Sequence, residues 1–325
     1  MDVPSPSKPA MPSGLSRRDA MRAGLLACAG AAMSRVAGAA PLEASAANTP
    51  VITKPIPSTG ERLPVIGLGT DSFGESDLPA VRAVIERMHE LGGKVIDTAA
   101  SYGDSEELIG KALASSGLRR SIFLATKLTD GGGFFGGLGG DASFERSLKR
   151  LKTSAVDLLQ VHNLQGVDQL MPQLREWKSA GRIRYLGITT SRVSQHEQMA
   201  ELMRKYVLDF IQVDYSIADR DAEKVIFPLA MQRKVAVLAN LPLIHGRLMR
   251  EVAASSLPPW AGEIGVRSWS QFLLKYVASH PAVTCAIPGT TKVAHLVDDQ
   301  LAGHGILPDP AMRRRMEDYW SRTFA

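Results

Sequence analysis

Four polar side chains lie where three successive apolar segments of this chain end. Asp97, Lys127 and His162 lie in or at the ends of KVIDTA, IFLATK and VDLLQVH, and Tyr102 follows Asp97 by five residues. Each segment is short, rich in β-branched residues and followed by turn residues and a helical pattern, which is typical of buried parallel strands. An ammonium near a phenol favours the phenolate and draws the pKa of the phenol toward neutral pH, so these residue types indicate proton-transfer chemistry.

Strand-like and helix-like segments alternate evenly after about residue 55, with no interruption rich in Pro and Ser. This alternation predicts a single (β/α)8 barrel over residues 56–325 rather than two domains. Residues 51–66 are punctuated by Pro and Gly, and they predict an N-terminal β-hairpin that turns at residues 58–61. The C-terminal strand ends of such a barrel face one pocket, so the four side chains are expected to converge there.

The combination of these motifs resembles the active site of the aldo/keto reductases. The resemblance begins at IPSTGERLPVIGLGT, continues through DTAASYGDSEELIGKAL and SLKRLKTSAVDLLQVHN, and reaches GRIRYLGIT, FIQVDYS and IPGTTKVAHLVDDQ. It implies reduction of an aldehyde or ketone with hydride from a nicotinamide cofactor, because no protein side chain supplies a hydride. It also implies that Tyr102 donates the proton and that Lys127 adjusts the pKa of the Tyr102 phenol. Asp97 would then hold Lys127, and His162 would direct the substrate oxygen.

The resemblance further implies a cofactor site along the later strand ends. Gln212 matches the position whose amide holds the nicotinamide carboxamide. Thr189 and Thr190 stand where the family commonly has Ser-Asn, and Asn240 stands where an aromatic residue commonly stacks on the nicotinamide, a contact worth about 1 kcal/mol. The other expected cofactor residues are Thr70, Leu241, Leu243, Gly289, Thr290, Thr291, His295, Asp298 and Asp299.

The resemblance favours NADP as the cofactor, with NAD as the alternative. The positions that often carry Arg or Lys for the 2′-phosphate are here Gly289 and His295. Lys292, helix-start amides and threonine hydroxyls could compensate for them. The chain contains no Rossmann fingerprint, and its scattered histidines form no ligand pattern, so no metal is expected.

The substrate pocket is the least specified part of the site. Phe73, Phe134 and Trp260 are the expected lining residues. Residues 130–141 hold seven glycines and cannot form a regular element, so they predict either a slack connector or a lid that carries Phe134.

The first 39 residues differ in composition from the rest of the chain. Arg17 and Arg18 precede an Ala/Gly-rich run that ends at residues 37–39, which resembles a twin-arginine export signal. The run is too short and too interrupted to span a membrane. We expect a signal over residues 1–39, a linker over residues 40–55, transient contact with the export machinery and a periplasmic protein. The alternative is a disordered basic extension on a cytoplasmic protein.

Composition limits the classes of partner. The chain has 325 residues, 45% hydrophobic and 22% charged, as in an ordinary globular domain. The net charge is +5, but the first 39 residues carry three of these charges, so a nucleic-acid surface is not expected. We expect a monomer that acts on a small carbonyl compound.

Two other functions stay open at this point. The periplasm has no obvious supply of reduced nicotinamide, and the cofactor positions depart from the family. These features favour a nucleotide-binding sensing module with little turnover, whereas the intact Asp97, Tyr102, Lys127 and His162 favour an enzyme. A lyase or isomerase using the same four residues on a sugar-like substrate is the third possibility.

Overall fold

A computed structural model describes residues 49–128 and 140–324 of the chain. The predicted signal over residues 1–39, most of the predicted linker and the loop that carries Phe134 lie outside the described residues. The chain divides into two units, Met1–Thr49 and Pro50–Ala325, and the second contains every element described below.

The segment that precedes residue 56 contacts the barrel unit. The backbone N–H of Ile52 donates to the carbonyl of Gly303 (2.8 Å), and strand β1 covers Thr53–Pro55. Residues 52–55 therefore contact the barrel unit, within the range 51–66 that is predicted as the hairpin and that overlaps the predicted linker over residues 40–55. The first hairpin strand occupies the last three of these residues, Thr53–Pro55.

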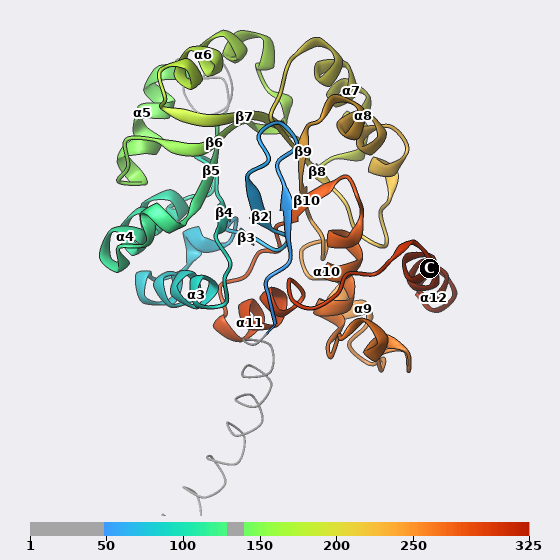
Figure 1. The fold of residues 1–325 in the computed structure, drawn as a ribbon. Coiled ribbons are helices and arrows are strands. Elements are labelled where there is room, and N and C mark those ends of the chain that lie inside the picture. Colours follow the sequence, from blue (N-terminus) through green and yellow to red (C-terminus); the bar gives the residue numbers. More distant parts are fainter. Residues whose placement is uncertain (1–48, 129–139, 325) are drawn as a thin grey trace, which may run out of the picture. The chain divides into compact units, whose positions relative to one another are not determined.

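The predicted N-terminal hairpin is confirmed. Strand β1 pairs antiparallel with β2 (Arg62–Pro64), and the turn is closed by a hydrogen bond from Ile56 N to the carbonyl of Glu61 (2.7 Å). Ile56 and Leu63 are fully buried in one apolar cluster with first residues of barrel strands, such as Val95 and Phe123. The hairpin therefore fills the end of the barrel where the strands begin, opposite the strand ends that carry the polar residues (Figure 1).

The described residues form an eight-stranded parallel sheet in the order in which the strands occur in the sequence, as predicted. The first and last strands meet through hydrogen bonds from Gly67 N to Ala286 O and from Gly69 N to Pro288 O, both 2.8 Å, which close the barrel. A Cβ on Gly69 would lie 2.9 Å from the carbonyl oxygen of Ile287, so this closure requires a glycine. The strands are β3 (Leu68–Gly69), β4 (Val95–Asp97), β5 (Phe123–Leu128), β6 (Val156–Val161), β7 (Ile183–Thr189), β8 (Phe210–Asp214), β9 (Ala236–Asn240) and β10 (Val283–Ala286).

Helices surround the sheet and cover its outer face (Figure 1). The first begins where the sequence indicates, because the Asp77 carboxylate accepts from Ala80 N (2.8 Å) and Pro79 occupies the first turn. None of the described helices is long and apolar enough to cross a membrane. The helices are α3 (Leu78–Glu90), α4 (Ser105–Ser116), α5 (Gly140–Arg150), α6 (Val167–Ser179), α7 (His196–Lys205), α8 (Ile226–Arg233), α9 (Arg247–Glu251), α10 (Trp269–Ser279), α11 (Val293–Leu301) and α12 (Pro310–Thr323).

Candidate active site

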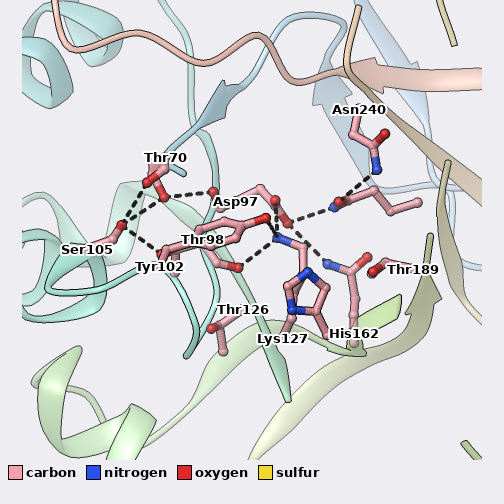
Figure 2. A network of polar contacts seen from close by, with 12 residues as sticks. Thr70, Asp97, Thr98, Tyr102, Ser105, Thr126, Lys127, His162, Thr189 and Asn240 are labelled. Atoms are coloured by element: carbon pink, nitrogen blue, oxygen red, sulfur yellow. Dashed lines mark hydrogen bonds and ion pairs between the residues drawn. The ribbon is translucent and has the colours of Figure 1, made fainter. Parts of the chain in front are cut away.

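Three neighbouring strands bring the four predicted catalytic side chains together. Asp97 is the last residue of β4, Lys127 is the next-to-last residue of β5, and His162 directly follows β6. Tyr102 lies on the turn after β4, where its N–H donates to the carbonyl of Ala99 (3.1 Å). Figure 2 shows the phenol, the carboxylate and the imidazole around the Lys127 side chain.

The amino group of Lys127 is the centre of the arrangement. Its Nζ lies 2.5 Å from Oδ2 of Asp97, 2.9 Å from the carbonyl oxygen of Thr98 and 3.3 Å from Oη of Tyr102. The side chain has no solvent exposure. Burial lowers the pKa of Lys127, but Asp97 and then Tyr102 outweigh this effect, so the pKa is raised above its usual value. The amino group is therefore held as a cation that touches the phenol.

The pKa of Tyr102 moves in the direction opposite to our expectation. Burial is the largest effect and raises the pKa above its usual value; Lys127 opposes the rise, and Asp97 adds to it. The expected net shift toward neutral pH is therefore wrong for the protein without ligands, because the desolvation of the phenol outweighs the nearby charge. The phenol stays protonated, which is the form that donates a proton.

His162 is a neutral imidazole. Burial, and then the positive charge of Lys127, lowers its pKa to about 3. Its ring lies edge-on to Tyr102 with 5.8 Å between ring centroids, and its Nδ1 lies 3.3 Å from Oγ of Ser101. At neutral pH this side chain carries one ring proton, so one ring nitrogen donates a hydrogen bond and the other accepts one.

Two glutamine amides hold the second oxygen of the Asp97 carboxylate. Nε2 of Gln160 lies 3.2 Å and Nε2 of Gln212 lies 2.9 Å from Oδ1. An ionised carboxylate only accepts hydrogen bonds, so it fixes the orientation of both amides. The sequence reasoning missed Gln160, although it precedes His162 by two residues in VDLLQVH and so shares its face of β6.

The side-chain amide of Gln212 is in turn hydrogen-bonded to the side-chain amide of Asn240. Nδ2 of Asn240 donates to the carbonyl of Thr190 (2.9 Å) and to Oε1 of Gln212 (3.3 Å). In the described part of the chain, Oε1 of Gln160 and Oδ1 of Asn240 are the buried side-chain polar atoms that lack a hydrogen-bond partner. Buried polar atoms are rarely left unpaired, and Asn240 lines the cavity described below, so its Oδ1 has acceptor capacity for a bound group.

A cavity of about 810 Å³ opens beside these groups. Asp97, Tyr102 and His162 line it, whereas Lys127 lies fully buried behind them. Most of the predicted cofactor residues also line it: Thr70, Thr189, Thr190, Gln212, Asn240, Leu241, Leu243, Gly289, Thr290, His295, Asp298 and Asp299. Lining residues that the sequence reasoning missed include Asp71, Asn163, Ser191, His245 and Met249.

Three of the predicted binding residues do not line the cavity. Phe73 has no solvent exposure and packs in the core between the sheet and the helices. Trp260 packs against Phe272 and Tyr319, at centroid distances of 5.7 and 6.0 Å. Neither ring lines the cavity as predicted, because Phe73 is enclosed in the core and Trp260 packs against two other aromatic rings. Thr291 is also absent from the cavity wall, and Phe134 lies outside the described residues.

Two neighbouring carboxyl groups, those of Asp298 and Asp299, also line the cavity. Asp298 accepts hydrogen bonds from Ser268 (2.9 Å) and Gln271 (2.7 Å), and Asp299 accepts one from Ser270. Burial raises the pKa of Asp299 to about 7. The described residues that line the cavity include no Lys or Arg.

A (β/α)8 barrel in which a protonated phenol, a buried ammonium and a neutral imidazole meet at a large cavity is the architecture of a carbonyl oxidoreductase. Residues 65–302 match the sequence profile of the Aldo/keto reductase family, and this chain belongs to that family. It is an enzyme of the oxidoreductase class.

Individual relatives are similar over most of their length. Methylglyoxal reductase YeaE of Escherichia coli K12 is 30% identical over 245 residues, which span 72% of this chain and 83% of the relative. An aldo-keto reductase of Klebsiella pneumoniae, solved with NADPH, is 26% identical with a TM-score of 0.71, covering 83% of this chain and 95% of that one. An aldo/keto reductase of the same organism, solved with NADP and acetate, is 27% identical with a TM-score of 0.67, covering 80% and 93%.

Proposed function

We propose that this protein reduces an aldehyde or ketone to the alcohol, with NADPH as the reductant and Tyr102 as the proton donor. The observation that carries the proposal is the contact of Lys127 Nζ with both the Asp97 carboxylate (2.5 Å) and the Tyr102 phenol (3.3 Å) at the cavity. Loss of the phenol proton creates a phenolate, and a fixed cation at this distance stabilises it.

The residues of the cavity fit a nicotinamide dinucleotide. The amides of Gln212 and Asn240 would hold the carboxamide, and the orphan Oδ1 of Asn240 gives this end unused acceptor capacity. Thr290 and the backbone N–H groups at the start of α11 would hold phosphate, since no Lys or Arg is among the described lining residues. We infer that the cofactor is NADP, because the two similar Klebsiella pneumoniae structures were solved with NADP and NADPH. When bound, the cofactor supplies the hydride.

The protein's own residues then handle the proton and the orientation. Tyr102 holds the proton at Oη, and Lys127 stabilises the charge left behind. Asp97, held by Gln160 and Gln212, keeps Lys127 charged and pointed at the phenol. His162, neutral at working pH, orients the carbonyl oxygen toward Tyr102.

Transfer of a deuterium label tests the reaction. The purified protein would be incubated with NADPH deuterated at the transferred position of the nicotinamide and with a panel of aldehydes and ketones. Methylglyoxal comes first, because the similar Escherichia coli protein bears that name. We expect deuterium on the carbinol carbon of the alcohol and matching oxidation of the cofactor, measured by mass spectrometry and absorbance.

The same experiment separates the other two functions. A sensing module would bind NADPH, seen as a change in its fluorescence, yet oxidise it with none of the carbonyl compounds. A lyase or isomerase would convert a sugar-like substrate without oxidising the cofactor. Either outcome contradicts the reductase.

We propose that residues 1–39 export the folded protein by the twin-arginine route, with its cofactor bound beforehand. The support is Arg17-Arg18 ahead of an Ala/Gly-rich run. Cell fractionation would compare the full chain with a chain lacking residues 1–39 and with an Arg17→Lys, Arg18→Lys variant. Periplasmic recovery of the full chain alone is expected. Equal cytoplasmic recovery of all three would contradict export.

A further inference from the structure

One turn holds His162 from two sides. The turn after β4 carries Ser101 and Tyr102 as adjacent residues, and it is closed by the hydrogen bond from Tyr102 N to the carbonyl of Ala99 (3.1 Å). Oγ of Ser101 lies 3.3 Å from Nδ1 of His162, while the ring of Tyr102 meets the imidazole edge-on. The same turn therefore positions both the phenol and the imidazole.

The two nitrogens of His162 have different surroundings. Nδ1 faces the Ser101 hydroxyl, whereas Nε2 has no hydrogen-bond partner among the described residues and is not one of their buried unpaired atoms. Because His162 lines the cavity, Nε2 is the nitrogen left for a ligand.

The position of the single ring proton decides what His162 can do. With the proton on Nε2, the imidazole donates a hydrogen bond into the cavity, as a carbonyl oxygen requires. With the proton on Nδ1, Nε2 presents a lone pair that repels the carbonyl oxygen. A second ring proton is disfavoured, because burial and Lys127 lower the pKa of His162 to about 3.

We propose that Ser101 is a positioning residue that stabilises the Nε2–H tautomer of His162. A serine hydroxyl can donate to or accept from an imidazole nitrogen, and in this proposal it donates a hydrogen bond to Nδ1, which leaves Nε2–H to donate to the carbonyl oxygen. The inference rests on the proposed function, since it assigns His162 a carbonyl oxygen to hold. Ser101 itself touches neither substrate nor cofactor in this role and acts through the imidazole.

The tautomer can be read without turnover. Protein labelled with ¹⁵N-histidine would be studied by NMR correlation of the ring nitrogens with the ring carbon-bound protons, with the His162 signals identified by their loss in His162→Gln. We expect the wild type to carry the proton on Nε2, Ser101→Ala to show a mixture of tautomers, and Ser101→Thr to restore the wild-type pattern. Ser179→Ala, which removes an exposed hydroxyl bonded to the carbonyl of Arg175, is the matched control.

Kinetics give the second measurement. Loss of one hydrogen bond predicts a fall in kcat/KM of about three- to tenfold in Ser101→Ala, with recovery in Ser101→Thr. A wild-type proton on Nδ1, or an unchanged tautomer in Ser101→Ala, overturns the proposal. An inactive protein with the expected tautomer pattern would support the role of Ser101 in placing the proton and would refute the reductase proposal alone.

Discussion

Replacing Lys127 by Met separates the structural and the chemical roles of the buried ion pair. The substitution keeps the length of the side chain and removes its charge. It leaves the Asp97 carboxylate, which is 3% exposed, without its counterion. The hydrogen bonds from Gln160 and Gln212 to the other carboxylate oxygen remain, so the carboxylate keeps part of its support.

The magnitude follows from the geometry. Two unit charges 2.5 Å apart attract by about 7 kcal/mol at an effective dielectric constant of about 20. The desolvation of both ions offsets much of this attraction, and loss of one partner of a buried pair costs about 3–5 kcal/mol in the free energy of unfolding. With two amides still bonded to Asp97, we expect Lys127→Met to fall near the lower end, about 3 kcal/mol.

A double-mutant cycle measures the coupling. Urea unfolding would be recorded for wild type, Lys127→Met, Asp97→Asn and the double variant. Because the double variant removes both charges, we expect it to be more stable than the sum of the single effects predicts, by at least about 2 kcal/mol. Lys127→Met and the double variant should lose kcat by about 100-fold or more, because both lack the cation that stabilises the phenolate, whereas Asp97→Asn keeps that cation and should lose less. Additive stability losses, or an active double variant, would refute the reasoning.

Three further substitutions test separate parts of the structure. The pKa of Asp299 is about 7 in the folded protein and 3.8 in the unfolded chain, so its contribution to the free energy of unfolding is complete below about pH 4 and is lost by about pH 7. Asp299→Asn should remove this loss of stability, which is worth up to about 4 kcal/mol. The free energy of unfolding measured across this pH range checks the prediction. The pKa of His162 is about 3 in the folded protein and 6.5 in the unfolded chain, so this side chain makes the free energy of unfolding rise with pH between these values. His162→Gln should remove that rise and so lower the slope of the free energy of unfolding against pH, whereas Asp299→Asn should raise the slope. Slopes that shift together would contradict both assignments. Phe73→Ala should cost about 3–5 kcal/mol of stability and leave the substrate KM of the folded enzyme unchanged, because the ring is fully buried away from the cavity; a changed KM would restore the predicted lining role.

The barrel fold and the catalytic residues could be predicted from the sequence, because both depend on local patterns of residues. The segment GRIRYLGIT, which carries part of the resemblance, contains β7, and Asp77 with Pro79 marks the start of α3. The four polar residues lie at or just beyond strand ends, so the topology alone brings them together. Helix α9, with five residues, is too short to leave a periodic signal.

The sequence could not give the direction of side chains outside the strands. Phe73 lies on a short 3₁₀ turn and Trp260 just before another, and nothing in their spacing tells whether the ring faces the cavity or the helices. The pKa of Tyr102 is a balance of burial against charge, and burial is known only once the loop is folded. Gln160 could have been predicted as a site residue, because the alternation of side chains along a strand places it on the same face as His162.

The role of Tyr102 as the acid is tested most directly by Tyr102→Phe, which removes one oxygen and keeps the ring that packs edge-on against His162. The dissociation constant for NADPH, read by fluorescence, serves as the control for an intact cavity. We expect an unchanged dissociation constant and a kcat for carbonyl reduction lowered by about 10²–10⁴-fold. A Tyr102→Phe protein that reduces the same carbonyl compound at the wild-type rate would contradict this role of Tyr102.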